Sequence, residues 1–266
     1  MCGIAGYSLA PHSRLDRTLA AQALLAAVAE RGTDAVGYAF PAPSGASGPA
    51  VVVKQQTPAS RLLEHVTVPA GTNEALVHVR DFTKGHPSVA ANNHPVRHGP
   101  VVGVHNGRIE NDDELLAAHA CARAEPSMTV DSEAVFALAA HSRGNAGAFE
   151  ALDGSMAAAW LDERRPGVLF VARGVGRPLW LGTWRNGVVF ASTAYALSVF
   201  EQVCGPNVRK RELGDGTLLA VRHGQVVSRQ RFRTPPWPET DALPADGGLA
   251  ERDVCLSRLA TIAAAA

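Results

Sequence analysis

The chain has 266 residues, 46% of them hydrophobic and 19% charged, which is the composition of a folded protein and excludes a disordered one. Its 25 basic and 25 acidic side chains balance, so no overall charge favours binding to nucleic acid or to a membrane surface. No apolar stretch approaches the roughly 20 residues that span a bilayer and the N-terminus lacks a signal peptide, so we expect a cytoplasmic enzyme or binding protein.

Hydrophobic patterning predicts strands and helices in alternation over the first half of the chain. Strands are expected over residues 4–9, 36–40, 50–54, 75–80 and 101–105, and helices over 15–28, 58–66, 114–123 and 131–141. Two segments predict loops because Gly, Pro and polar residues replace the periodicity, at 41–49 and at 81–99. The second loop also contains His and Asn, so we expect functional residues there.

From residue 156 the pattern changes to short strands joined by tight turns. They are expected over 156–161, 168–172, 178–182, 188–192, 217–221 and 225–227, and the basic residues 209–211 are interpreted as a solvated turn. Residues 233–248 are rich in Pro, Asp and Gly and predict a linker before a weakly amphipathic helix over 249–263. We expect an antiparallel, layered α+β domain over residues 2–232 and a C-terminal tail with a short helix over 233–266.

The first residues, Met-Cys-Gly-Ile-Ala-Gly-Tyr, contain the most reactive candidate group. Removal of the initiator methionine would give Cys2 both a thiol and a free α-amine. The thiolate is the nucleophilic form, and an α-amine with a pKa of roughly 7.7–8.0 can take the thiol proton. The alternative is an incidental thiol behind a start codon.

Polar residues at the ends of predicted elements provide further candidates, each with a structural alternative. Arg80, at a strand end beside a Gly-rich loop, either binds a carboxylate bidentately or lies in a surface salt bridge. The pair Asn106–Gly107 either forms a hairpin turn or supplies an amide and an open backbone N–H to an oxyanion. Asp131 is either a helix N-cap or a carboxylate for a substrate ammonium, and His94 lies before Pro95 in a segment that also fits a turn.

No signature of a metal or an organic cofactor is present. The four cysteines are scattered, and the ten histidines include no His-Glu-x-x-His motif. Gly174-Val-Gly176 lacks the third glycine and the acidic partner of a dinucleotide-binding loop, and there is no P-loop. We therefore expect the protein to need neither metal nor cofactor.

Together these residues resemble the glutaminase domain of class II glutamine amidotransferases, which are N-terminal nucleophile hydrolases. The resemblance covers roughly residues 2–230, and each motif alone is weak while the ordered set is specific. The motifs are Cys2-Gly3-Ile4-Ala5-Gly6, Arg31-Gly32-Thr33-Asp34, Arg80-x-x-Thr83-x-Gly85, Asn92-x-His94-Pro95, Val104-His105-Asn106-Gly107-x-Ile109-x-Asn111 and Asp131-x-Glu133. Their order and spacing are most similar to the glutaminase domain of glucosamine-6-phosphate synthase, and His78-Val79-Arg80 is similar to the amidophosphoribosyltransferase version.

The resemblance implies a four-layer αββα sandwich of antiparallel sheets that hydrolyses L-glutamine through a thioester on its N-terminal cysteine. It implies that Cys2 is the nucleophile and that Asn106 and Gly107 form the oxyanion hole. It further implies that Arg80 binds the α-carboxylate and Asp131 the α-ammonium of glutamine, with Thr83 and His94 in the same pocket.

The chain departs from the family pattern at three positions and in its extent. Asp81 and Lys84 replace a Trp and a His of the synthase pattern, and Thr33 replaces the usual Pro or Tyr. Because only a short tail follows residue 230, we expect a subunit that passes ammonia to a separate synthase, and an oligomer is compatible with this. The alternatives are an amidohydrolase of a γ-glutamyl compound, with a pocket reshaped by Asp81 and Lys84, and a non-catalytic regulatory subunit.

Overall fold

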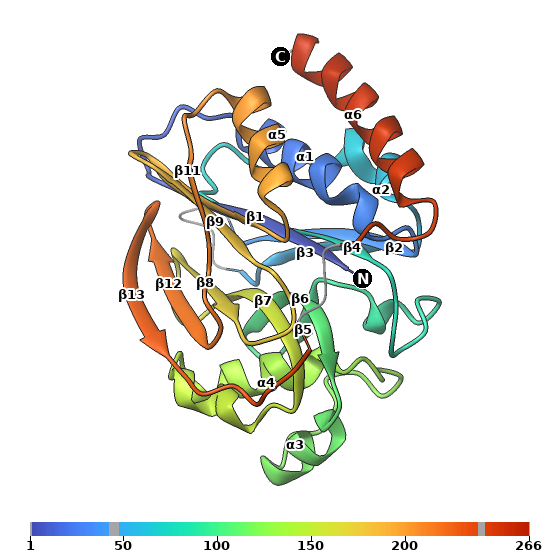
Figure 1. The fold of residues 1–266 in the computed structure, drawn as a ribbon, viewed down its shortest axis with the longest axis vertical. Coiled ribbons are helices and arrows are strands. Elements are labelled where there is room, and N and C mark those ends of the chain that lie inside the picture. Colours follow the sequence, from blue (N-terminus) through green and yellow to red (C-terminus); the bar gives the residue numbers. More distant parts are fainter. Residues whose placement is uncertain (1, 43–47, 239–242, 266) are drawn as a thin grey trace.

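A computed structural model describes residues 2–42, 48–238 and 243–265. It contains two antiparallel β-sheets stacked face to face, with helices on both outer faces (Figure 1). The predicted α+β class and the αββα sandwich are therefore confirmed. Part of the loop expected over 41–49, namely residues 43–47, lies outside the described residues.

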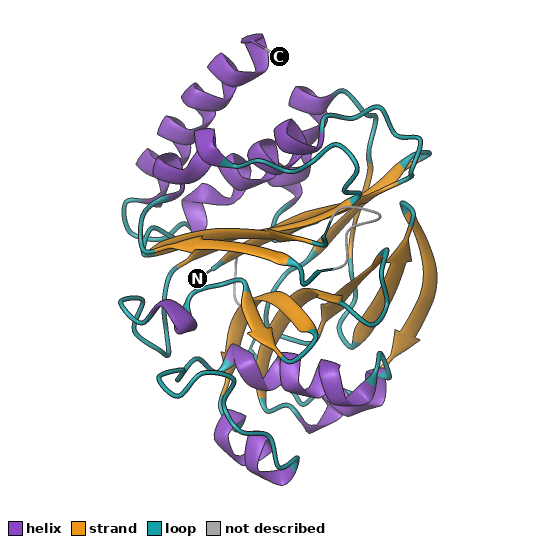
Figure 2. Cartoon of the chain, turned by 180° about the vertical axis from the view of Figure 1, so that it is seen from behind, coloured by secondary structure: helices purple, strands orange, loops and turns teal. Residues whose placement is uncertain are grey.

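The first sheet is formed by strands from the beginning and the last third of the chain. They are β1 (Gly3–Leu9), β2 (Ala35–Phe40), β3 (Val51–Gln55), β4 (Glu74–Arg80), β9 (Trp180–Trp184), β10 (Gly187–Ala191) and β11 (Arg209–Glu212). Their order is β11-β9-β10-β1-β4-β2-β3, so β1 lies at the centre of the sheet. Four helices cover its outer face: α1 (Arg17–Val28), α2 (Ala59–Leu62), α5 (Ala194–Cys204) and α6 (Gly248–Ala265) (Figure 2).

The second sheet is formed by the middle of the chain and the strands that follow α5. They are β5 (Val96–His98), β6 (Val101–Ile109), β7 (Gly154–Asp162), β8 (Val168–Arg173), β12 (Thr217–Arg222) and β13 (Gln225–Arg231), in the order β13-β12-β8-β7-β6-β5. Helices α3 (Asp112–Ala118) and α4 (Ser132–Ser142) lie on the side of this sheet that faces away from the first sheet.

Three apolar layers hold the sandwich together, one between the sheets and one under each set of helices. Ile4, Leu76 and Val104 belong to the central layer, whereas Ala5, Tyr7 and Leu9 point from β1 towards the helices of the first sheet. Every residue of β1 is buried, because side chains alternate between two covered faces. Strand β1 therefore holds the N-terminus in the middle of the molecule.

Three elements differ from what the sequence predicts. Strand β5 lies within residues 81–99, which are expected to be a loop, and it pairs with β6. Residues of α5 are not predicted as a helix, although Thr193 caps its N-terminus by accepting a hydrogen bond from the Ala196 amide and Gly205 ends it in the left-handed conformation. The basic segment interpreted as a turn is strand β11, which pairs with β9 at the sheet edge, where exposed charged side chains are favourable.

Helix α6 packs against the helical layer of the first sheet. Its Cys255 and Leu259 are buried in the same apolar cluster as α1, and Arg252 forms an ion pair with Glu30 at 2.6 Å. It spans residues 248–265, which is longer than the short helix expected over 249–263. The division of the chain at residue 232 stays a prediction.

Candidate functional site

Cys2 lies directly before β1 and is fixed through its backbone. The Arg31 Nε donates a hydrogen bond to the Cys2 carbonyl at 3.1 Å, and the Ile4 amide donates to the Ser192 Oγ at 3.0 Å. The Cys2 Sγ approaches the carbonyl oxygen of Asp81 at 3.5 Å. The candidate nucleophile is thus placed at the end of β4, which runs antiparallel to β1.

The Arg-Gly-Thr-Asp segment at residues 31–34 supports the end of β4. A Cβ on Gly32 would lie 2.3 Å from the Arg80 carbonyl carbon, so only glycine permits this approach. The Asp34 amide donates to the Arg80 carbonyl at 2.9 Å, and an Asp34 carboxylate oxygen accepts from the Phe82 amide at 2.9 Å. The segment therefore fixes both the strand end and the first turn of the loop that follows it.

Arg80 is buried at the end of β4, where its guanidinium is held by three acceptors. Its Nη1 donates to the Asn93 Oδ1 at 2.6 Å, and its Nη2 donates to the Lys84 carbonyl at 2.9 Å and also to the Gly85 carbonyl. Burial lowers the pKa of Arg80, and the nearby Cys2 and Asp131 oppose that shift. An arginine remains charged under these conditions, so a cation lies next to the cysteine. The surface salt-bridge interpretation is wrong, since only 2% of Arg80 is exposed.

Asn106 and Gly107 lie inside β6 and do not form a hairpin turn. They pair with Ala157 and Met156 of β7, and the pairing continues to Ile109. A Cβ on Gly107 would lie 2.0 Å from the Ser155 carbonyl oxygen, which accounts for glycine at this position. Among the described residues, the buried Asn106 Nδ2 has no hydrogen-bond partner. A buried donor left unpaired is costly unless a ligand pairs with it.

Asp131 precedes α4 but does not cap it through its side chain. One carboxylate oxygen instead accepts a hydrogen bond from the Ile109 amide at 2.7 Å. This bond joins the Asp131 segment to the end of β6, two residues beyond Gly107. The N-cap interpretation is therefore wrong, and the buried carboxylate shares a cleft with Arg80.

Three buried histidines lie behind the site. The ring of His94 stacks on His78 with a centroid distance of 4.2 Å, and the His78 Nε2 contacts the His105 carbonyl at 3.2 Å. Burial lowers the pKa of His78 to about 3 and also lowers the pKa values of His94 and His105. These rings are therefore neutral at physiological pH, and neither ring nitrogen of His94 has a partner in the described part of the chain.

A small cleft brings most of the predicted residues together. Of the seven candidate residues, all but Asn106 line it, namely Cys2, Arg80, Thr83, His94, Gly107 and Asp131. They come from the residue before β1, the end of β4 and its loop, the segment before β5, strand β6 and the residue before α4. A larger cavity beside Glu74, at the other end of β4, contains none of them.

Groups around the cleft shift the pKa of the Cys2 thiol in opposite directions. Burial raises the pKa of Cys2, the positive charges of Arg80 and Arg31 lower it, and Asp131 raises it. Burial dominates, so the thiol is protonated at neutral pH and needs a base before it can attack. Within the described residues, no group of three or more His, Cys, Asp or Glu side chains could hold a metal ion.

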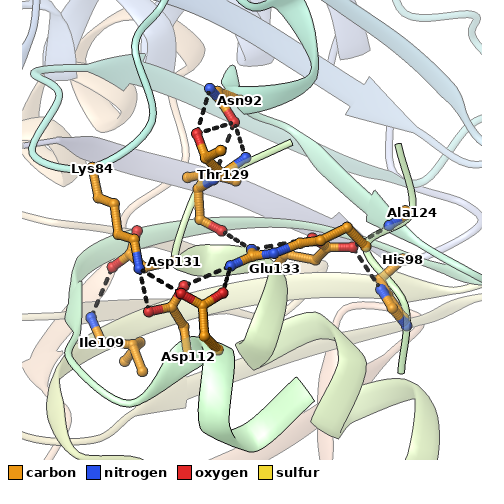
Figure 3. A network of polar contacts seen from close by, with 12 residues as sticks. Lys84, Asn92, His98, Ile109, Asp112, Ala124, Thr129, Asp131 and Glu133 are labelled. Atoms are coloured by element: carbon orange, nitrogen blue, oxygen red, sulfur yellow. Dashed lines mark hydrogen bonds and ion pairs between the residues drawn. The ribbon is translucent and has the colours of Figure 1, made fainter. Parts of the chain in front are cut away.

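Lys84 and its partners form a charged network at one side of the cleft. Lys84 points towards Asp112, with 2.6 Å between Nζ and Oδ1 (Figure 3). Arg123 donates to the other oxygen of Asp112 at 2.8 Å and to an oxygen of Glu133 at 3.3 Å. Neither Asp112 nor Arg123 could be chosen as a site residue from the sequence, because no motif contains them and their contacts join distant segments.

A comparison with protein families finds a match over part of the chain. Residues 84–199 match a family described as a glutamine amidotransferase domain, whereas no curated protein matches the chain. In the part of the chain that the structure describes, no helix is long and apolar enough to cross a membrane.

Three solved structures have a similar fold at low sequence identity. Glutamine phosphoribosylpyrophosphate amidotransferase from B. subtilis, in complex with ADP and GMP, is 18% identical with a TM-score of 0.64, over 86% of this chain and 49% of that one. An allosteric regulatory enzyme of purine biosynthesis is 20% identical with a TM-score of 0.66, over 86% and 49%. A glutamine aminotransferase class-II domain protein from Silicibacter pomeroyi is 18% identical with a TM-score of 0.52, over 87% and 100%. This chain thus spans about half the length of the first two.

The stacked antiparallel sheets and their helical layers define the chain as a protein of the N-terminal nucleophile hydrolase fold. Residues 84–199 match a glutamine amidotransferase domain family, and the fold of the chain is similar to that of the solved amidotransferase structures. The closer similarity to glucosamine-6-phosphate synthase stays a prediction.

Proposed function

We propose that the chain hydrolyses L-glutamine to glutamate and ammonia, with Cys2 as the nucleophile once the initiator methionine is removed. The observation that carries this proposal is the cleft shared by Cys2, Arg80, Gly107 and Asp131. A fork-shaped cation and a carboxylate beside a thiol suit a free amino acid with an amide in its side chain. Residues 2–232 would form the catalytic domain.

The proposed reaction proceeds through a thioester. The α-amine of Cys2 takes the thiol proton, and the thiolate attacks the side-chain carbonyl carbon of glutamine. The Asn106 amide and the Gly107 N–H stabilise the oxyanion, each contributing on the order of 3–4 kcal/mol. Collapse of the intermediate breaks the C–N bond, and the protonated α-amine returns its proton to the leaving ammonia. Water then attacks the thioester to release glutamate and the thiol.

Arg80 and Asp131 bind the two charged groups on the α-carbon of glutamine in this proposal, and Thr83 and His94 border the same space. The buried, unpartnered Asn106 amide supports the oxyanion role, because an oxyanion would pair with it. In this proposal the ammonia passes to a synthase on a separate chain.

The first test is glutamate release by the purified chain. Wild type is expected to release glutamate and Cys2→Ala is expected to release none, since the nucleophile is absent. Cys121→Ser is the matched control, because this half-buried thiol lies outside the cleft and its loss leaves the rate unchanged. Release by Cys2→Ala at the wild-type rate would contradict the proposal.

Mass spectrometry of the N-terminus distinguishes a catalytic chain from a non-catalytic regulatory subunit. A catalytic chain begins with Cys2, whereas a retained initiator methionine would leave no α-amine on the nucleophile. Comparing γ-glutamyl amides with free glutamine tests the amidohydrolase alternative, which predicts the higher kcat/KM for the amides.

A further inference from the structure

Lys84 connects Arg80 to Asp112, a buried carboxylate that lies outside the cleft. Its ammonium lies 2.6 Å from the Asp112 Oδ1, and Asp112 is 1% exposed. Its own backbone carbonyl accepts a hydrogen bond from the Arg80 Nη2 at 2.9 Å. Displacement of Lys84 would therefore move an acceptor of Arg80.

Asp112 is also joined to the segment before Asp131. The Arg123 Nη2 donates to the Asp112 Oδ2 at 2.8 Å, and the Arg123 Nη1 donates to the Val130 carbonyl at 2.7 Å. A second connection runs through the Asn92 Oδ1, which accepts from the Val130 amide at 3.0 Å. Two connections thus join the loop after β4 to the segment that ends at Asp131 (Figure 3). One consists of the charged side chains of Lys84, Asp112 and Arg123, and the other is the side-chain amide of Asn92.

We propose that Lys84 is a positioning residue: its ion pair with Asp112 sets the spacing between Arg80 and Asp131. This inference rests on the proposed function, in which these two residues bind the α-carboxylate and α-ammonium of glutamine. The network fixes both sides of that site before the substrate arrives, so less ordering is required on binding.

The contacts of Lys84 favour positioning over direct binding of a substrate anion. Burial by itself would lower the pKa of Lys84, but the hydrogen bond and charge of Asp112 outweigh it and raise the pKa. Release of the ammonium to a substrate would take a cation from a carboxylate that is almost fully buried, which is unfavourable. Lys84 therefore acts on glutamine through the backbone that it holds.

The test compares Lys84→Met with Lys210→Met, which removes an ion pair of the same 2.6 Å length between Lys210 and Glu201, away from the cleft. We expect Lys84→Met to raise the KM for glutamine roughly tenfold, about the effect of one hydrogen bond to a charged group, with little change in kcat. Lys84→Arg restores KM, and Lys210→Met leaves it unchanged.

A double-mutant cycle separates positioning from direct contact. Asp112→Asn is expected to raise KM at least as much as Lys84→Met, because it weakens the contact with Arg123 as well as the ion pair with Lys84. The double variant should raise KM no further than Asp112→Asn alone, because the Lys84–Asp112 interaction is already lost. If Lys84 touched the substrate directly, Asp112→Asn would free the ammonium and KM would not rise, which would overturn the inference.

Amide hydrogen exchange provides a readout that does not depend on activity. Lys84→Met should speed exchange in residues 81–93 and in 123–131, and Lys210→Met in neither. Unchanged exchange in both segments overturns the inference. Faster exchange with an unchanged KM also overturns it. If the wild type releases no glutamate but Lys84→Met still speeds exchange, the proposed function is refuted. The link between Lys84 and the two segments is then supported independently of it.

Discussion

At the scale of single residues, the site contains buried polar groups that have no hydrogen-bond partner among the described residues. The Asn106 Nδ2 is buried without a hydrogen bond in the described residues, and both ring nitrogens of His94 are in the same state. Such groups destabilise a fold unless they serve another purpose, because burial removes their water. In the proposed reaction the Asn106 amide is paired when the oxyanion forms.

Asn106→Ala is expected to lower kcat about 10²–10³-fold, the usual effect of losing one oxyanion donor. The free energy of unfolding should change by less than about 1 kcal/mol, because the amide nitrogen has no hydrogen bond to lose within the described part of the chain. Glutamine turnover and urea unfolding measure the two effects.

Asn145→Ala is the matched control with the opposite outcome. The Asn145 Oδ1 caps a short helix by accepting from the Gly147 amide at 3.0 Å. Its removal should cost about 1 kcal/mol of stability and leave kcat unchanged. A large stability loss in Asn106→Ala would argue against a role confined to the transition state.

At the scale of elements, α6 contributes to the core, although the sequence predicts that it belongs to a C-terminal tail. Leu259 is 1% exposed and lies in the apolar cluster beneath α1, α5 and the first sheet, whereas Leu249 of the same helix is 50% exposed. The Glu251 carboxylate accepts hydrogen bonds from the Ser60 amide at 2.6 Å and from its hydroxyl at 3.1 Å. The helix is therefore fixed by both apolar and polar contacts.

Leu259→Ala is expected to lower the free energy of unfolding by about 2–4 kcal/mol, because it leaves a cavity under the helix. Leu249→Ala should change it by less than about 0.5 kcal/mol, since an exposed side chain makes few contacts. Urea unfolding followed by circular dichroism measures both. Equal effects of the two substitutions would show that α6 does not pack as described.

At the scale of the whole molecule, the buried histidines behind the site make stability depend on pH. His78, His94 and His105 are neutral when folded because burial lowers their pKa values, but in the unfolded chain they bind protons near pH 6.5. The unfolded state then binds more protons below pH 6.5, so acid favours unfolding. Their stabilising effect is complete above pH 6.5 and is lost as the pH falls towards the folded pKa values.

We expect the free energy of unfolding to fall on acidification from pH 6.5 to 4.5, by about 1.4 kcal/mol per pH unit for each extra proton bound on unfolding. Urea unfolding at several pH values measures this slope. His78→Gln should reduce the slope by close to one proton. A slope that this variant leaves unchanged would contradict the assignment.

Glu74 gives stability the opposite dependence on pH from that of the histidines, and a separate variant tests it. Burial raises the pKa of Glu74 to about 7, so its carboxyl group stays protonated below about pH 7 in the folded state, and stability falls as the pH rises from 4.5 to 7. Glu74→Gln should therefore stabilise the protein at pH 8, by up to about 3 kcal/mol, and have little effect below pH 4.5.

Much of the fold could be predicted because its strands are short apolar runs between turn residues. Strands β1, β2, β4 and β8 follow the hydrophobic pattern closely. Helix α5 also carries a signal, with Thr193 and Gly205 at its ends. Strand β11 has none, since its residues are charged and its conformation depends on pairing with β9.

By itself, the sequence determined which chemical groups are available and in what order: a cysteine at position 2, an arginine after a buried strand, an Asn-Gly pair and an aspartate before a helix. Only the tertiary structure decided that Asn106 and Gly107 continue a strand and that Asp131 binds the Ile109 amide rather than its own helix. It also decided that Lys84 is paired with Asp112. The physical reason is that each alternative was locally acceptable, and the choice depended on hydrogen bonds and burial supplied by residues far away in the chain.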